Sequence, residues 1–279
     1  MIEEDLPSVR GEARVDGVRI AYETRGSGPA LVCCHAFAVD RSMWDVQHAP
    51  FSRSHRLITF DQRGSGESEH PVATEGVPDP YTVDTFAEDL RGVLDDLGIE
   101  RARILGFSMG AATALRFATL WPQRVERLVL ASAMASRLPD EIIERAQKVL
   151  DVLERDGMQQ AYRFYFGGPL FDGLAESDGP GMDLDRIARG ATPRGFRGCF
   201  GVTINRPSMV SDLHRIVAPT LILVGGNDVH YLEDAELMAR RIPDARKVVL
   251  DGLGHAMSRE APQVFADEVL GFLSPESRD

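Results

Sequence analysis

Residues 106–110 read GFSMG and place Ser108 between two glycines, at a point where two kinds of secondary structure meet. The largely apolar residues 103–107 predict a buried strand, and the mostly small and apolar residues 109–120 predict a helix. At so tight a strand-to-helix turn, side chains two positions from the serine would collide with the backbone, and the serine hydroxyl stands above the edge of the sheet. The pattern therefore predicts a nucleophilic serine rather than an ordinary turn serine flanked by glycines.

A serine hydroxyl becomes a good nucleophile only beside a base, and the base needs an acid that orients it. In an open parallel sheet these partners are expected just beyond the carboxyl ends of later strands. The predicted strands at residues 220–224 and 247–250 run into GGND and DGLGH, whose last residues are Asp228 and His255. We therefore predict that His255 is the general base for Ser108 and that Asp228 is its orienting acid.

Other acids and histidines compete for these two roles. Asp234 lies where a helix begins and favours its N-terminus, Asp244 lies in a turn, and Asp251 directly ends a strand. Among the histidines, His230 is near the expected site and could line its entrance. Four others lie in polar or loop segments and are expected at the surface: His48, His55, His70 and His214.

Acyl transfer also needs two N–H groups that point at the developing oxyanion. The amide of Met109, at the start of the helix after Ser108, is one candidate. The segment after the predicted strand at residues 30–34 reads HAFAVD, and the amide of Phe37 is our candidate for the second. In the same segment His35 is expected to brace the loop and to lie at the substrate pocket, because the position of the base is already filled.

Strands and helices alternate along most of the chain. Further strands are predicted at residues 18–24, 57–60 and 128–131, and further helices at residues 82–97, 233–241 and 262–273. This alternation predicts an α/β fold, in which a parallel sheet carries helices on both faces. Residues 1–10 are predicted to form a loose arm.

Residues 135–217 break the alternation and are too many for a connecting loop. We interpret them as a helical lid over the carboxyl edge of the sheet, which divides the core into residues 1–134 and 218–279. The lid residues Phe164, Phe166 and Phe200 are expected to line an apolar substrate pocket, although they could equally form the lid's own core. Three lid arginines could receive a substrate carboxylate, but solvated surface is the favoured interpretation of each: Arg163, Arg194 and Arg197.

Composition narrows the classes of function. Of the 279 residues, 43% are hydrophobic and 27% are charged, as in an ordinary globular protein. The formal net charge of −12 argues against binding to nucleic acid or to an anionic membrane surface. Three cysteines without CxxC spacing, Cys33, Cys34 and Cys199, predict neither a disulfide framework nor a metal site, and the expected location is cytoplasmic. Neither a signal peptide nor a membrane-spanning run is predicted.

Together these segments resemble the α/β-hydrolase superfamily over nearly the whole chain. The matching pieces are VCCHAF, FDQRGSGES, GFSMG, APTLILVGGNDV and GLGHAM. The resemblance implies a mostly parallel eight-stranded sheet with helices on both faces and a helical cap, and the order serine, acid, histidine is the triad order of that fold. One departure is Ala36, where the family usually has glycine, so its methyl group fits only if its φ is negative. Within the superfamily the chain is most similar to lidded serine esterases and lactonases of the 3-oxoadipate enol-lactonase type.

The resulting hypothesis is hydrolysis of a small, largely apolar carboxylic ester or lactone through an acyl-enzyme, with no metal or organic cofactor. The expected partner is that small-molecule substrate, and the chain is expected to be a monomer or a homodimer. Three alternatives on the same fold stay open: a carbon–carbon bond hydrolase, a cofactor-free peroxidase, and a ligand receptor that keeps the triad.

Overall fold

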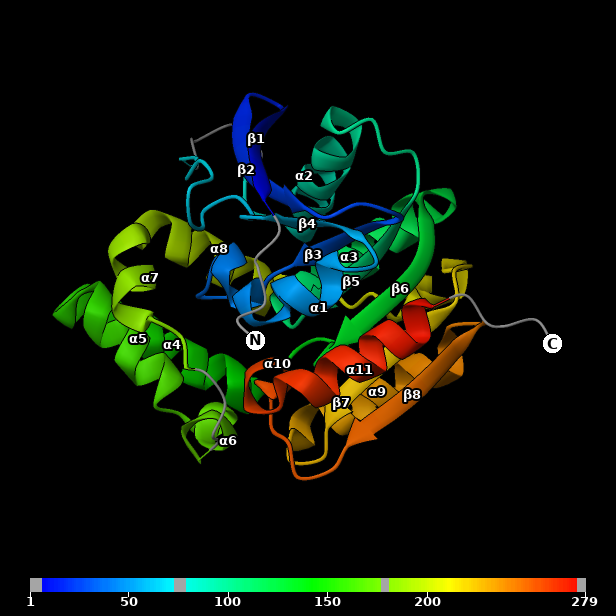
Figure 1. The fold of residues 1–279 in the computed structure, drawn as a ribbon. Coiled ribbons are helices and arrows are strands. Elements are labelled where there is room, and N and C mark those ends of the chain that lie inside the picture. The colour runs from blue at the N-terminus through cyan, green and yellow to red at the C-terminus, as the bar shows by residue number, and fades with distance from the viewer. Residues whose placement is uncertain (1–6, 73–78, 177–180, 275–279) are drawn as a thin grey trace, which may run out of the picture.

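The computed structural model describes residues 7–72, 79–176 and 181–274 of the chain. Within them, one sheet has the strand order β1-β2-β4-β3-β5-β6-β7-β8 (Figure 1). The strand β2 is antiparallel to β1 and to β4, and the other neighbours are parallel. The prediction of a mostly parallel eight-stranded sheet is therefore confirmed. The strands are β1 (Ser8–Val15), β2 (Val18–Arg25), β3 (Ala30–Cys34), β4 (Arg56–Phe60), β5 (Ala102–Phe107), β6 (Val125–Ala131), β7 (Thr220–Gly225) and β8 (Ala245–Leu250).

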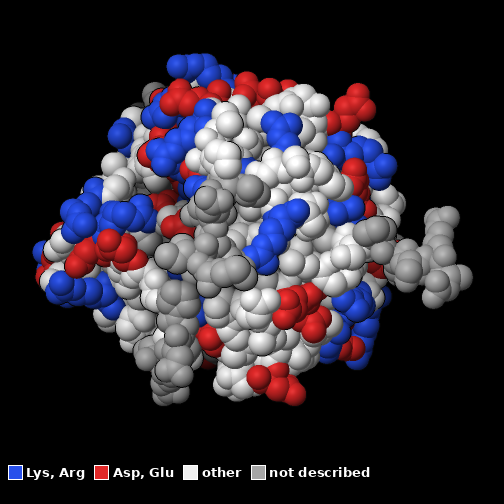
Figure 2. All heavy atoms as spheres, in the orientation of Figure 1, with Lys and Arg blue, Asp and Glu red and all other residues white. Residues whose placement is uncertain are grey.

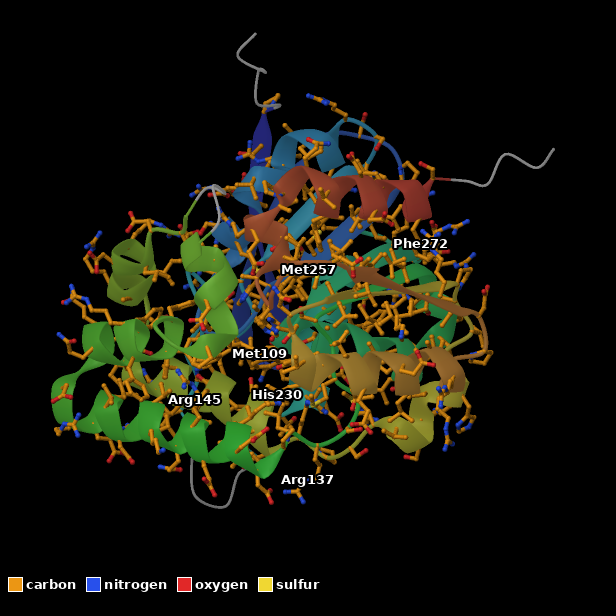
Figure 3. The ribbon with its side chains drawn as sticks, turned by 90° about the horizontal axis from the view of Figure 1, so that it is seen from below. Met109, Arg137, Arg145, His230, Met257 and Phe272 are labelled. Atoms are coloured by element: carbon orange, nitrogen blue, oxygen red, sulfur yellow. The ribbon has the colours of Figure 1, made fainter. Side chains whose placement is uncertain are left out.

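Helices cover both faces of this sheet (Figures 1 and 3). On one face α11 (Pro262–Leu273) packs against α1 (His48–Ser52), the short helix α10 (Met257–Glu260) and the 3-10 segment η1 (Arg41–Gln47). On the other face α2 (Val83–Asp96) packs against α3 (Met109–Leu120), which is followed by η2 (Pro122–Arg124). The helix α9 (Val229–Arg241) packs on β7 and β8, and in Figure 3 it lies on the opposite side of the sheet from α11.

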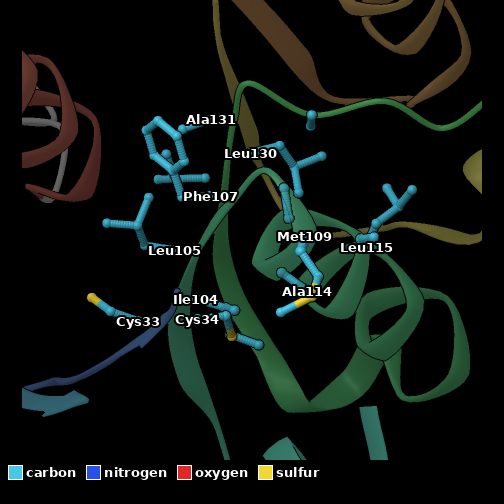
Figure 4. Close-up of a cluster of buried hydrophobic side chains, with 14 of the residues drawn as sticks. Cys33, Cys34, Ile104, Leu105, Phe107, Met109, Ala114, Leu115, Leu130 and Ala131 are labelled. Carbon is cyan, nitrogen blue, oxygen red and sulfur yellow. The ribbon is translucent and has the colours of Figure 1, made fainter. Parts of the chain in front are cut away.

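The central strands are apolar along their length because helices bury them from both sides. Every residue of β3 from Leu31 to Cys34 is fully buried. Figure 4 shows Cys33 and Cys34 at the end of this strand, beside Ile104 and Leu105 of the neighbouring β5. Both cysteines are free, and burial raises the pKa of each thiol. They therefore pack as small hydrophobic side chains.

The N-terminal edge of the sheet differs from the prediction. Residues 1–6 lie outside the described residues, but residues 8–10, expected in a loose arm, belong to β1. This strand pairs with β2 from Ser8 opposite Arg25 to Val15 opposite Val18. Asp16 and Gly17 make the turn with positive φ values of 49° and 83°, which suits a two-residue hairpin. The Asp-Gly pair was the sequence signal for this hairpin.

Between β6 and β7 the chain leaves the sheet and forms a run of helices, seen at the left of Figure 1. The helix α4 packs against α5 and α8, and α5 packs against α7. The last segment, η4 (Val210–Arg215), packs against α3 and α9 of the core. The others are α4 (Asp140–Asp156), α5 (Met158–Phe166), η3 (Pro169–Phe171), α6 (Asp172–Glu176), α7 (Leu184–Gly190) and α8 (Pro193–Asn205).

Two surface properties bear on possible partners. On the face in Figure 2, Lys and Arg side chains are interspersed with Asp and Glu, so that face carries no extended basic surface. Across residues 7–72, 79–176 and 181–274, no helix has both the length and the apolar character needed to cross a bilayer.

Candidate active site

Ser108 occupies the turn between β5 and α3 in a backbone conformation that residues other than glycine rarely adopt. Its φ is 52° and its ψ is −111°. A Cβ atom added at Gly106 would lie 2.4 Å from the carbonyl oxygen of Gly110, and one added at Gly110 would lie 2.1 Å from the carbonyl oxygen of Cys34. Both glycines are thus required by close backbone approach, which is the reason the sequence suggested for them.

Three side chains from distant segments form one hydrogen-bonded line. The Nε2 atom of His255 lies 3.1 Å from the Ser108 Oγ, and its Nδ1 lies 2.8 Å from the Asp228 Oδ2. Asp228 follows β7 and His255 follows β8, and both side chains are buried. The parallel order of β5, β6, β7 and β8 brings the three ends to the same edge of the sheet. The structure therefore brings together the three residues expected to form the triad.

The rival acids have other positions. Asp234 accepts the amide N–H groups of Ala135 and Ser136, at the point where the chain leaves the core for the inserted helices. Asp244 and Asp251 are exposed. These three carboxylates are therefore not the partner of the histidine.

The loop that carries His255 is held by a residue that the sequence analysis missed. The carboxylate of Glu260 accepts the amide N–H of Gly254 at 2.6 Å and that of Ala256 at 3.0 Å. Ser132 donates its hydroxyl to the carbonyl oxygen of His255 at 3.1 Å. Glu260 therefore binds the backbone on both sides of His255. Its only signal in the sequence was a carboxylate five positions after His255.

Tyr231 is a second residue that the sequence analysis missed. Its ring centroid lies 4.7 Å from that of His255, and its side chain lines the same cavity as Ser108. Burial raises the pKa of Tyr231, so its hydroxyl stays protonated at neutral pH and is available as a hydrogen-bond donor at the cavity. The position three residues after Asp228, on the first turn of α9, was the available signal.

The two amides expected to form an oxyanion hole lie on adjoining segments. Met109 is the first residue of α3, so its N–H has no partner within the helix. Phe37 follows β3, which neighbours β5 in the sheet, and its side chain is buried. Ala36 is not among the described residues with positive φ, so the condition for its methyl group is met. The positive φ in this loop, 59°, lies at Ala38 instead.

His35 braces this loop and does not reach the substrate cavity, so its assignment to the pocket is corrected. Its Nε2 accepts the amide N–H of Gln62 at 3.0 Å, and its Nδ1 lies 2.7 Å from the carbonyl oxygen of Ala36. The side-chain amide of Gln62 in turn donates to the His35 carbonyl oxygen. Burial lowers the pKa of His35, which keeps the ring neutral. The side chain is fully buried, and both of its ring nitrogens have backbone partners.

A cavity of about 1000 Å³ lies above Ser108, between the inserted helices and the loops that carry Asp228 and His255. The predicted pocket residues Phe200 and His230 line it. A second cavity of about 30 Å³ also reaches Ser108 and His255, and it is bounded by Phe37 and the predicted Phe166. Apolar side chains make up much of the larger wall, among them Leu138, Ile142, Val149, Tyr165, Leu170 and Phe171.

Phe164 does not line either cavity, and its assignment to the pocket is corrected. It is 39% exposed, and the Arg145 guanidinium lies over its ring at 5.8 Å. Two histidines expected at the surface, His48 and His55, are buried. His55 lies inside because its ring nitrogens contact the Ser54 hydroxyl and the guanidinium of Arg103.

Charged groups at the cavity come from both the core and the insert. The Nδ1 of His230 on α9 lies 3.1 Å from the Oε1 of Glu141 on α4. Arg145, one turn further along α4, lines the same cavity, and Figure 3 labels it with His230 and Met109 where the insert meets the core. Among the residues that the structure describes, no group of three or more His, Cys, Asp or Glu side chains could hold a metal ion. The three arginines considered from the sequence, Arg163, Arg194 and Arg197, are exposed and lie outside this cavity.

Known proteins share this architecture. The family model described as alpha/beta hydrolase fold matches residues 29–167. A hydrolase from Pseudomonas aeruginosa PA01 superposes with a TM-score of 0.80 at 29% identity, over 98% of this chain and 100% of that one. The enol-lactonase from Burkholderia xenovorans LB400 has a TM-score of 0.77 at 25% identity, over 95% of this chain and 100% of its own. By sequence, 3-oxoadipate enol-lactonase 2 of Acinetobacter baylyi (strain ATCC 33305 / BD413 / ADP1) is 28% identical over 89% of this chain and 90% of its own.

Proposed function

The chain belongs to the α/β-hydrolase family, and from that premise we propose that it hydrolyses a carboxylic ester or lactone through Ser108, His255 and Asp228. The observation that carries the proposal is the continuous hydrogen-bonded line from the serine hydroxyl through the imidazole to a buried carboxylate. The cavity above the serine supports it, because the nucleophile faces a space large enough for a small organic substrate.

In the first step His255 takes the hydroxyl proton of Ser108 while the serine oxygen attacks the carbonyl carbon. Asp228 accepts a hydrogen bond from Nδ1, so the proton-accepting nitrogen of the neutral ring is Nε2, which faces the serine. The same carboxylate stabilises the imidazolium that forms. The amides of Phe37 and Met109 donate to the oxyanion of the tetrahedral intermediate.

The intermediate then collapses, and the imidazolium gives its proton to the leaving alkoxide. Water attacks the acyl-enzyme with His255 again as the base, which releases the acid and restores the serine. We propose that residues 135–217 serve as the lid of this site, because helices α4 and α8 supply much of the cavity wall opposite the triad.

The test compares matched variants on 4-nitrophenyl esters of increasing acyl length and on simple lactones. Ser108→Ala and Asp228→Asn should each lower kcat by about 10⁴-fold or more, with the melting temperature little changed for Asp228→Asn. Asp251→Asn removes an exposed carboxylate close to His255 in sequence and should leave the rate unchanged.

A fluorophosphonate should modify the wild-type protein at Ser108, as read by peptide mass spectrometry, and should not modify Ser108→Ala. Hydrolysis by Ser108→Ala at the wild-type rate would remove the serine from the mechanism. Equal effects of Asp228→Asn and Asp251→Asn on kcat would show that Asp228 is not the acid of the triad.

A further inference from the structure

Arg145 is a cation at the substrate cavity without an acidic partner. Among the described residues it forms no ion pair, whereas three carboxylates of the wall have partners. Glu141 pairs with His230, Asp228 binds His255, and Glu260 accepts two backbone amides. The remaining lining carboxylate is Asp172, an exposed residue in the first turn of α6, which does not pair with Arg145.

The arginine side chain is held in place by apolar and backbone contacts. Its guanidinium lies over the Phe164 ring at 5.8 Å between the Cζ and the ring centroid. A Cβ atom on Gly168 would lie 1.6 Å from the Arg145 Nη2, so the guanidinium occupies the space that a larger residue at position 168 would fill. Arg145 is half-buried, and its side chain contacts Phe164 of α5 and the turn after α5. These contacts hold the planar group but leave its N–H donors unpaired by any carboxylate.

A guanidinium at a largely apolar wall favours a planar anion, because its N–H groups match the two oxygens of a carboxylate. Resting on the proposed function, we propose that the substrate is an ester or lactone that carries a free carboxylate, and that Arg145 binds this carboxylate while Ser108 attacks the carbonyl. The cavity of about 1000 Å³ extends from the serine to the arginine and has room for such a bifunctional molecule. The residue sets specificity and does not touch the reacting atoms.

The test uses two chromogenic esters of matched length. The acyl chain of 4-nitrophenyl hemiglutarate ends in a carboxylate, and that of 4-nitrophenyl pentanoate ends in a methyl group. The measured quantity is the ratio of kcat/KM for the anionic ester to that for the neutral ester. Wild type should favour the anionic ester, and Arg145→Gln should lower the ratio by about tenfold to a hundredfold, mainly through KM.

Two further variants separate a binding role from a structural one. Arg145→Lys keeps the positive charge but loses the paired N–H groups of the guanidinium, so it should retain part of the preference for the anionic ester. Arg163→Gln removes an equal charge from the exposed side of α5, outside the cavity, and should leave both rates unchanged. Raising the salt concentration should lower the wild-type ratio more than that of Arg145→Gln, because screening weakens an ionic contact.

A second measurement distinguishes failure of this proposal from failure of the proposed function. Calorimetric titration of both esters into Ser108→Ala should show tighter binding of the anionic ester, and the added Arg145→Gln change should abolish the difference. Turnover of both esters with a ratio that Arg145→Gln does not change would overturn the anion site and leave the hydrolase intact. A binding preference that depends on Arg145, without turnover of either ester, would support the anion site and overturn the proposed reaction.

Discussion

The conformation of Ser108 predicts an unusual stability difference between two inactive variants. With φ at 52° and ψ at −111°, the residue lies outside the regions that L-residues ordinarily occupy. Ser108→Ala keeps the Cβ atom and therefore keeps the strain, whereas Ser108→Gly removes it. Both variants lose the hydroxyl and its contact with His255, so those losses cancel in the comparison.

The size of the difference follows from two opposing terms. A residue held in such a region costs on the order of 1–3 kcal/mol. Glycine gives back roughly 0.5–1 kcal/mol, because its unfolded chain has more conformational freedom to lose. We therefore expect Ser108→Gly to exceed Ser108→Ala by about 1 kcal/mol in free energy of unfolding, which corresponds to roughly 2–4 °C in melting temperature for a chain of this size.

The assay is thermal unfolding followed by circular dichroism, with urea unfolding as an independent measure. Ala239→Gly, in the helical backbone of α9, is the control, and there the change from alanine to glycine should lower stability by about 1 kcal/mol. The two sites are thus expected to respond in opposite directions. If Ser108→Gly were less stable than Ser108→Ala by the amount lost at residue 239, the turn at Ser108 would carry no strain.

Two further outcomes follow from contacts around the triad. Tyr231→Phe keeps the ring against His255 but removes a hydroxyl from the cavity that Ser108 also lines, so kcat should fall by about threefold to tenfold. Tyr162 lies outside the larger cavity, and Tyr162→Phe should leave kcat unchanged. An unaltered kcat in Tyr231→Phe would contradict a role for that hydroxyl. Burial lowers the pKa of His35 in the folded state, so the unfolded chain binds more protons and the free energy of unfolding falls as the pH drops below about 6.5. His35→Gln should reduce this decrease in the free energy of unfolding by up to about 1.4 kcal/mol per pH unit, as measured by urea titrations at several pH values. The same pH dependence in wild type and His35→Gln would contradict this role of His35.

The turn at Ser108 and the triad could be predicted because their sequence signals are local and the parallel sheet brings the strand ends together. GFSMG requires only that a strand ends and a helix begins, and the close approach of Gly110 to the Cys34 carbonyl supplies the reason for glycine. Asp228 and His255 needed one further assumption, that parallel strands end at a common edge, and the sheet satisfies it. The first strand was missed because only two of its eight residues are buried, which gives little hydrophobic signal to set against its polar N-terminal half.

The pocket could not be predicted in the same way, because in the insert the side of a helix that faces the substrate depends on packing angles between helices. Phe164, Tyr165 and Phe166 are consecutive, yet the first is half in solvent and the other two border the cavities. Packing also determines which arginine lines the cavity: Arg145 on α4 does, whereas the three arginines weighed from the sequence do not. Residues 106–110 are restricted by backbone contacts that allow one arrangement, whereas an amphipathic helix specifies a buried side without specifying what it covers. Chemistry at the sheet edge is therefore readable from short motifs, while substrate choice, which depends on the insert, becomes readable only with the helices in place.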